Sequence, residues 1–341
     1  MADIALSVKN LSVRFPIRGG VFSKVQNYFT AVDKVSFNLE QGKILSIVGE
    51  SGCGKSTLVK ALVGLVDFCE GQYVLFGEAV KKKASSWKRV RDYVQMVFQD
   101  PFSSLNPRQT ILEVMTAPLV ARGVGFDTAR AKAQELLERV SIPAGALEKF
   151  PHEFSGGQRQ RLCIARALTV SPKILLCDEV TSALDVSVQA QILHLLDDLR
   201  NDLGISIVFI SHDMQVVRAL SDQVLVMYLG QKVEFGKSSE IFYDGKLSGI
   251  VNGQLLRHPY TEALLRSVPT LSKDNPPEIL PFLGDGSGGK SGGCLENAGC
   301  KFYGRCKYGE ASCLSGNINS MENSGNWDTH FIRCIKGNNI K

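Results

Sequence analysis

A glycine-rich stretch near the start of the chain constrains the fold more than any other feature. It follows the pattern G-x-x-x-x-G-K-[ST] over Gly49, Glu50, Ser51, Gly52, Cys53, Gly54, Lys55, Ser56 and Thr57. Glycines let successive backbone N–H groups wrap a polyphosphate without a Cβ in the way. Lys55 is suited to the β- and γ-phosphates, and the Ser56 hydroxyl to Mg²⁺. A buried-strand run at 43–48 precedes the loop and a helical run at 57–63 follows, which places the phosphates at a helix N-terminus.

The composition is that of an ordinary globular protein with room for more than one domain. The 341 residues are 44% hydrophobic and 21% charged, with a net charge of +5. This mild positive charge does not by itself indicate a nucleic-acid partner. The first residues lack the basic and apolar regions of a signal peptide, and no apolar run approaches the ~18 residues of a membrane span. We therefore expect a cytosolic chain that reaches a membrane only through a partner.

The order of the expected elements favours an α/β fold. Alternating residues at 4–14 predict an antiparallel strand, and a basic, aromatic insert at 16–30 precedes another strand at 31–37. Further along the chain, strands and helices alternate, with strands expected at 93–98, 174–177 and 205–210 and a helix at 187–201. Such alternation indicates a parallel sheet with crossover helices.

The remaining organisation is a helical insertion and a C-terminal extension. Residues 102–170 are expected to form a helical subdomain within the core, and 224–236 a closing hairpin. We therefore place a phosphate-loop domain at 1–236, an extension at 237–293 that ends in a Gly/Ser-rich linker at 284–293, and a cysteine-rich module at 294–341.

Carboxylate and amide side chains at strand ends supply the chemistry for hydrolysing ATP. Asp178 and Glu179 follow four apolar strand residues, at the end of the sheet where parallel-sheet sites lie. Asp178 is suited to Mg²⁺, and Glu179 to orienting and deprotonating the attacking water. Gln99, at another strand end, could contact Mg²⁺ and the water. His212 could hydrogen-bond the γ-phosphate and stabilise developing charge.

A second anion site is expected where a helix begins near residue 156. Ser155 is a good N-cap, and two glycines leave the helix start bare, over the set Ser155, Gly156, Gly157 and Gln158. One chain therefore carries two phosphate-binding helix starts. A single ATP can use both if two such domains pair head to tail.

The ordered set of motifs resembles an ABC-transporter ATPase over roughly residues 4–236. It comprises the Walker A motif at 49–57, the Q-loop at Gln99, the signature at 154–158, Walker B at 174–179, the D-loop at 182–185 with Asp185, and the H-loop at His212. Phe154 replaces the usual signature Leu, and Val180 replaces the usual Pro after the catalytic Glu. The resemblance implies an aromatic residue that stacks on adenine. Phe15 is the first choice by position, with Tyr28 or Phe29 as alternatives.

A narrower resemblance points to the oligopeptide/dipeptide importer subfamily of these P-loop NTPases. It rests on residues 50–53, 98–107, 151–155, 185–191, 258–261 and 268–269. It implies a peripheral protein on the cytoplasmic face of the cell membrane, with a second ATPase subunit that is a paralogue, two transmembrane permease subunits and an extracytoplasmic substrate-binding protein. Some members of the subfamily carry nickel or oligosaccharides, so the cargo class is only implied.

Five of the nine cysteines fall within the last 48 positions. Disulfides are not expected in a reducing compartment, so the cluster indicates metal or redox chemistry. The set Cys300, Cys306, Cys313 and Cys334 resembles the pattern that holds a [4Fe–4S] cluster in some members of the subfamily. Zinc and no metal at all are the alternatives, and the wide spacings argue against zinc. Cys294 would either replace Cys334 as a cluster ligand or bind no metal.

Two functions compete on the sequence. The first is an ATP-driven import motor, in which ATP closes a head-to-tail dimer and hydrolysis opens it. The second is a soluble ABC ATPase that works on nucleic acid or in iron–sulfur assembly. Such proteins usually fuse two ATPase cores or insert long coiled coils, and neither feature occurs in this sequence. The sequence therefore favours the import motor, without nucleic acid as a partner.

Overall fold

The computed structural model describes residues 3–19, 23–81, 83–242, 250–251, 254–255, 257–267, 299–315 and 330–334. The chain divides into two compact units, each assembled from separate segments of the sequence. The helical unit comprises Met1–Leu6, Leu39–Ile44 and Leu75–Ser211. The phosphate-loop unit comprises Ser7–Asn38, Leu45–Val74 and His212–Lys341.

Three parallel strands form the sheet of the helical unit, in the order β8-β7-β6. They are β6 (Val94–Val97), β7 (Ile174–Asp178) and β8 (Ser206–Ile210). Every residue of β7 and β8 is buried, as expected for strands covered on both faces. Val97 pairs with Cys177, and Asp178 pairs with Ile210. The parallel sheet expected from the sequence is therefore confirmed.

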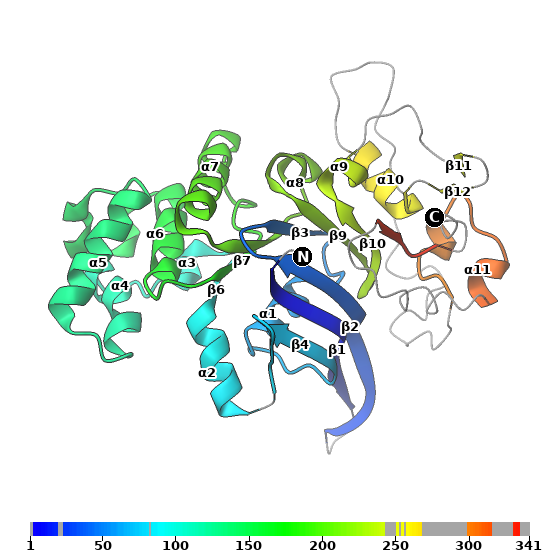
Figure 1. The fold of residues 1–341 in the computed structure, drawn as a ribbon, viewed down its shortest axis with the longest axis horizontal. Coiled ribbons are helices and arrows are strands. Elements are labelled where there is room, and N and C mark those ends of the chain that lie inside the picture. Colours follow the sequence, from blue (N-terminus) through cyan, green and yellow to red (C-terminus); the bar gives the residue numbers. More distant parts are fainter. Residues whose placement is uncertain are drawn as a thin grey trace. The chain divides into compact units, whose positions relative to one another are not determined.

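Helices dominate the rest of this unit, as predicted for residues 102–170. They are α2 (Ala84–Tyr93), α3 (Pro101–Ser104), α4 (Ile111–Val120), α5 (Phe126–Arg139), α6 (Gly156–Leu168) and α7 (Val186–Leu203), with 3₁₀ turns η1 (Ala144–Glu148) and η2 (Pro151–Glu153) and the short strand β5 (Glu78–Ala79). Helices α4 and α5 pack together, and α5 also packs on α6 (Figure 1). Thr110 and Glu113 form a capping box that fixes the start of α4.

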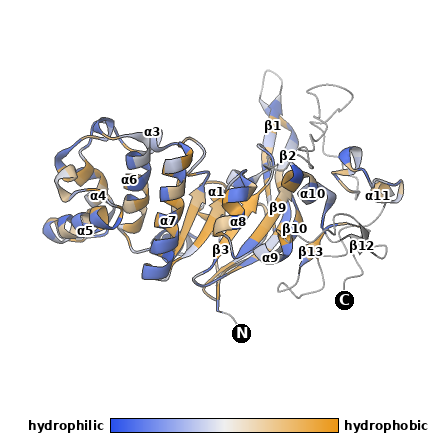
Figure 2. Ribbon diagram, turned by 90° about the horizontal axis from the view of Figure 1, so that it is seen from above, coloured by the Kyte–Doolittle hydropathy of each residue, from blue (hydrophilic) through white to orange (hydrophobic). Residues whose placement is uncertain are grey.

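The main sheet of the phosphate-loop unit runs in the order β13-β10-β9-β3. It consists of β3 (Ile44–Val48), β9 (Gln223–Tyr228), β10 (Gln231–Lys237) and β13 (Phe331–Ile332). β3 and β9 are parallel and hydrophobic, as Figure 2 shows. β9 and β10 form the predicted antiparallel hairpin. β13 pairs antiparallel with β10, with Phe331 opposite Phe235, so a strand from the end of the chain covers the edge of this sheet.

A second sheet of this unit contains β2, β1 and β4 as neighbours. Their bounds are β1 (Ile4–Gly19), β2 (Lys24–Glu40) and β4 (Glu70–Leu75). The insert expected at 16–30 is therefore strand at 16–19 and 24–30. These residues are mostly exposed, so they lack the alternation of apolar residues that identifies a half-buried strand.

Shorter elements complete the phosphate-loop unit. They are α1 (Lys55–Leu62), α8 (Met214–Leu220), α9 (Ser238–Ile241), α10 (Pro259–Arg266), α11 (Ser312–Ser315), η3 (Tyr303–Arg305), β11 (Ile250–Val251) and β12 (Gln254–Leu255). Tyr260 from α10 and Phe302 pack with Tyr228 of β9 in one buried cluster. None of the helices in the described part of the chain is both long and apolar enough to cross a membrane. The linker expected at 284–293 lies outside the described residues.

Candidate functional site

The predicted phosphate loop connects β3 to α1, and two of its glycines are required by close packing. A Cβ on Gly49 would lie 2.2 Å from the carbonyl oxygen of Met227. A Cβ on Gly54 would lie 2.3 Å from the carbonyl oxygen of Ala31. Gly54 also has a φ of +104°, which side chains rarely tolerate. The loop therefore passes so close to neighbouring backbone that only glycine fits at these positions.

Lys55 lies at the start of α1 and is buried, with 4% of its surface exposed. Its ammonium donates to the carbonyl oxygens of Gly49, at 2.7 Å, and Glu50, at 3.0 Å. Cys53 in the same loop is also buried, and burial raises the pKa of its thiol although Lys55 opposes the rise. Cys53 therefore stays a neutral packing residue, while Lys55 brings a positive charge into the loop.

Two residues that sequence reasoning did not select contact this loop. The phenol oxygen of Tyr260 accepts a hydrogen bond from the Glu50 N–H at 2.7 Å. Arg305 forms two hydrogen bonds to the Glu50 carboxylate. Tyr260 belongs to the stretch 258–261 that carried the subfamily resemblance, and Arg305 directly precedes Cys306. Neither pattern indicated a role at the phosphate loop.

The acidic pair of the helical unit lies at the end of β7, as predicted. Asp178 is the last residue of the strand and is 4% exposed. Glu179 has a φ of +48°, a rare conformation for a residue with a side chain, and its N–H donates to the Ile210 carbonyl oxygen at 3.2 Å. The amide nitrogen Nε2 of Gln99 lies 3.1 Å from Oε2 of Glu179. The structure therefore brings together two of the residues selected for the chemistry.

The signature residues begin helix α6, and Ser155 is its N-cap, as predicted. The Ser155 hydroxyl accepts from the N–H of Gln158, and the Gln158 side chain accepts from the N–H of Ser155 at 3.0 Å. A Cβ on Gly157 would lie 2.4 Å from a methyl carbon of Val188 in α7, so this glycine permits close packing of the two helices. Asp185 directly precedes α7 and its side chain forms no capping hydrogen bond.

The remaining nucleotide-site candidates are exposed. His212 follows β8 and is exposed, in the phosphate-loop unit. Phe15 is 39% exposed, and Tyr28 and Phe29 are each 50% exposed. All three rings are therefore accessible to an adenine base, and exposure does not distinguish between them. The loop from Gly49 to Thr57 belongs to the phosphate-loop unit, whereas Gln99, Asp178, Glu179, Ser155 to Gln158 and Asp185 belong to the helical unit.

Three of the predicted cluster cysteines lie near one another. The Cys300 N–H donates to the carbonyl oxygen of Cys313 at 2.8 Å. Burial, together with the charges of Cys306 and Cys313, raises the pKa of the Cys300 thiol. Among the described residues, however, no group of three or more His, Cys, Asp or Glu side chains is arranged to hold a metal ion. Cys294 lies outside the described residues, so its role stays a prediction.

Two family models match the chain. That of the ABC transporter family matches residues 32–182, and that of the oligopeptide/dipeptide transporter C-terminal region matches residues 233–313. The oligopeptide transport ATP-binding protein OppF of Haemophilus influenzae is 40% identical over 346 residues, covering 98% of this chain and 97% of that protein. The glutathione import ATP-binding protein GsiA of Escherichia coli strain K12 is 45% identical over 280 residues, covering 81% of this chain but 43% of that protein.

Solved structures show the same fold. CbiO1 of Clostridium perfringens, part of the ABC transporter complex cbiONQ, superposes with a TM-score of 0.62 at 27% identity, covering 72% of this chain and 93% of that one. The ATP-binding cassette MJ0796, in a dimeric post-hydrolysis state bound to ADP and Pi, superposes with a TM-score of 0.61 at 28% identity. That match covers 68% of this chain and 98% of the cassette.

Proposed function

Because this chain belongs to the ATP-binding subunits of ABC transporters, with an oligopeptide/dipeptide transporter C-terminal region, we propose that it powers the import of oligopeptides or dipeptides. As a member of this family it is an ATPase that uses ATP and Mg²⁺. The cargo class rests on the oligopeptide transport function of OppF and on the match to the oligopeptide/dipeptide transporter C-terminal region. The function of GsiA extends the candidate cargo to glutathione, itself a small peptide.

The observation that carries the proposal is the phosphate loop with its buried lysine. The Lys55 ammonium is held by the carbonyl oxygens of Gly49 and Glu50, and Lys55 is also the first residue of α1. Such a site suits the phosphates of ATP, because the helix start and the ammonium group both favour an anion. We assign Gly49 to Thr57 to phosphate binding. For adenine stacking Phe15 is the first choice, with Tyr28 and Phe29 as alternatives.

The helical unit would supply the hydrolytic chemistry. We assign the general base to Glu179, whose carboxylate already has a hydrogen-bonding partner in Gln99. Ser56, Gln99 and Asp178 are the proposed ligands of Mg²⁺, which when bound neutralises developing charge on the phosphates. His212 would hydrogen-bond the γ-phosphate and stabilise the charge that develops on it.

The proposed motor is a head-to-tail dimer. The start of α6, with Ser155 to Gln158, and Asp185 would complete the nucleotide site of a second ATPase subunit, which we take to be a paralogue. The MJ0796 cassette is dimeric with ADP and Pi bound, which supports the pairing of two such subunits. Two membrane permease subunits and an extracytoplasmic binding protein would complete the importer, with this chain at the cytoplasmic face of the membrane.

Isolation of the complex tests the proposed function. The tagged full-length chain is expected to co-purify from detergent-solubilised membranes with two permease subunits and a second ATPase subunit. Once reconstituted with the binding protein, the complex should hydrolyse ATP faster when a di- or oligopeptide is added. Stimulation by nickel or an oligosaccharide, without any by peptides, would favour the alternative cargo. An ATP-dependent complex with nucleic acid and no membrane partner would contradict import altogether.

We also propose that the cysteines of the C-terminal segment hold a [4Fe–4S] cluster. The proximity of Cys300, Cys306 and Cys313 supports the idea, and Cys334 would be the fourth ligand. These thiols are not arranged as a metal site in the described structure, so ligation requires their side chains to turn toward a common point. Anaerobic purification tests the proposal: a brown, iron-containing protein supports it, and a colourless protein without iron contradicts it.

A further inference from the structure

Glu50, the second residue of the phosphate loop, is held at three separate points. Its N–H donates to the Tyr260 phenol oxygen at 2.7 Å. Its carbonyl oxygen accepts from the Lys55 ammonium at 3.0 Å. Its two carboxylate oxygens each accept from one terminal nitrogen of Arg305, at 2.9 and 3.0 Å. Paired bonds of this kind between a guanidinium and a carboxylate are among the strongest and most directional in proteins.

Arg305 is itself fixed by its surroundings. Its side chain is 7% exposed, whereas that of Glu50 is 40% exposed. The guanidinium carbon lies 5.9 Å from the ring centres of both Tyr228 and Phe302, within the range of a cation–π contact. Burial opposes its charge, but the hydrogen bonds and charge of Glu50 raise the pKa of Arg305 further above its usual range. In this ion pair the buried cation, Arg305, is held in place by its surroundings, and the carboxylate of Glu50 is the more accessible partner.

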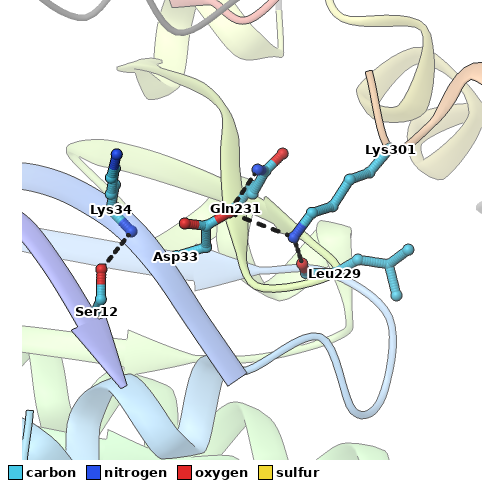
Figure 3. Close-up of polar contacts among 6 residues, drawn as sticks. All are labelled: Ser12, Asp33, Lys34, Leu229, Gln231 and Lys301. Carbon is cyan, nitrogen blue, oxygen red and sulfur yellow. Dashed lines mark hydrogen bonds and ion pairs between the residues drawn. The ribbon is translucent and has the colours of Figure 1, made fainter. Parts of the chain in front are cut away.

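The same C-terminal segment makes a second contact beside the loop. Lys301 donates to the Leu229 carbonyl oxygen at 2.9 Å and lies 3.5 Å from the Asp33 carboxylate (Figure 3). The neighbouring Gly230 N–H donates to the carbonyl oxygen of Cys53 at 2.9 Å. The segment 299–315 thus contacts the phosphate loop directly at Glu50 through Arg305, and indirectly at Cys53 through Lys301 and the turn at 229–230.

A carboxylate in a phosphate loop opposes the binding of a nucleotide with several negative charges. At Glu50 the charge is balanced by Arg305, 255 positions later in the sequence. We propose that Arg305 is a positioning residue of the nucleotide site. It neutralises Glu50 and holds the loop for the incoming phosphates. This inference rests on the proposed role of residues 49–57 in ATP binding. It makes the C-terminal segment part of the nucleotide site of its own chain.

Nucleotide affinity of the full-length chain tests the role of Arg305. Binding of the non-hydrolysable ATP analogue AMP-PNP with Mg²⁺ is measured by calorimetry. Arg305→Gln is expected to weaken binding about tenfold, because Glu50 is left as an unbalanced charge close to the phosphates. In the double variant Glu50→Gln/Arg305→Gln, most of that loss should be recovered, because the opposing charge is gone. A purely structural role of Arg305 would leave the double variant as weak as the single one.

Matched variants separate this inference from the proposed function. Lys307→Gln removes a cation two residues away that pairs with Glu262, and should leave the affinity unchanged. Arg305→Lys keeps the positive charge, so its affinity for AMP-PNP should fall by less than about threefold. This variant provides a test if Arg305→Gln does not fold. Wild-type affinity in Arg305→Gln, or a tenfold loss in Arg305→Lys, would overturn the inference. Failure of Lys55→Ala to abolish binding would instead overturn the proposed phosphate site.

Discussion

The side-chain amide of Gln99 donates a hydrogen bond to the carboxylate of Glu179, with 3.1 Å between Nε2 and Oε2. The two residues follow the neighbouring parallel strands β6 and β7, so the sheet itself sets their separation. Glu179 also adopts a φ of +48°, a conformation that neighbouring structure must maintain. The proposed general base is therefore oriented by the fold before a nucleotide binds.

Replacing Glu179 by Gln should separate ATP binding from hydrolysis. The amide keeps the shape of the side chain but cannot accept a proton, so we expect turnover to fall at least about a hundredfold. Binding of ATP should persist, and an ATP-bound dimer with its partner subunit should accumulate in size-exclusion chromatography. Glu138→Gln, an exposed position in α5, is the control and should hydrolyse ATP normally. Turnover at the parental rate in Glu179→Gln would remove Glu179 from the mechanism.

Gly157→Ala should destabilise the contact between α6 and α7. The added methyl group would lie 2.4 Å from a methyl carbon of Val188, so the Val188 side chain or one of the two helices must shift. Overpacking of this kind costs about 1–3 kcal/mol, measured as a lower midpoint in urea unfolding. At Gly145 nothing lies within 4 Å of an added Cβ, so Gly145→Ala should unfold close to wild type. Equal midpoints for the two variants would show that the helices adjust freely.

Tyr260→Phe should weaken the phosphate-loop unit although it removes a single oxygen atom. The variant keeps the ring contacts with Tyr228 and Phe302 but leaves the Glu50 N–H without its acceptor. Loss of the acceptor for this partly buried N–H costs about 1 kcal/mol, which calorimetric or urea unfolding would detect. Tyr93→Phe changes a ring that is 38% exposed and serves as the control. An unchanged unfolding midpoint in Tyr260→Phe would mean that water replaces the phenol.

The docking of β13 should depend on pH through His330. Burial of His330 and the positive charge of Arg257 both lower its pKa. The hydrogen bond to Glu234 at 2.6 Å and the negative charges of Glu234 and Glu240 act in the opposite direction and are stronger, so the pKa of His330 is raised. A raised pKa means that the protonated histidine stabilises the fold. That stability is fully present below the unfolded value of about 6.5 and is lost as pH rises through the folded pKa.

Melting temperature as a function of pH checks this behaviour. The melting temperature of the wild-type chain should fall by a few degrees more between pH 6 and pH 9 than that of the His330→Gln variant. The variant should lack the part of the dependence of melting temperature on pH that His330 causes. His258 is also buried nearby, but burial lowers its pKa to about 3, so it stays neutral throughout this range. A steeper slope in His330→Gln than in wild type would contradict the assignment.

Local patterns in the sequence were sufficient for much of the fold and the candidate site. The strand–loop–helix around residues 49–57, the acidic end of β7 and the capping role of Ser155 were all expected, because each depends on residues close in sequence. The confirmed parallel sheet follows from the alternation of strands with helices. These features are set by periodicity and by the chemistry of helix ends.

Other features depend on pairs of residues far apart in the sequence. Tyr260 and Arg305 lie 210 and 255 positions from Glu50, and nothing in either segment indicates which loop it contacts. The exposed ends of β1 and β2 were interpreted as an insert, because a strand without a buried face shows no alternation. The adenine-stacking aromatic stays undecided for a related reason: three exposed aromatic residues share the same hairpin.

The pairing of β13 with β10 bears on how shortened versions of this chain should be made. A fragment ending near residue 236 would lose Phe331 and Ile332, and would uncover the edge of β10 at Glu234 and Phe235, although β9 still pairs with the other edge. An open strand edge is a template for pairing with another molecule, and therefore for aggregation. Such a fragment would also lose the buried aromatic ring of Phe302 from beside Tyr228. Expression of the apparent catalytic core alone is thus expected to give insoluble material, and a longer boundary beyond Cys334 is the better choice.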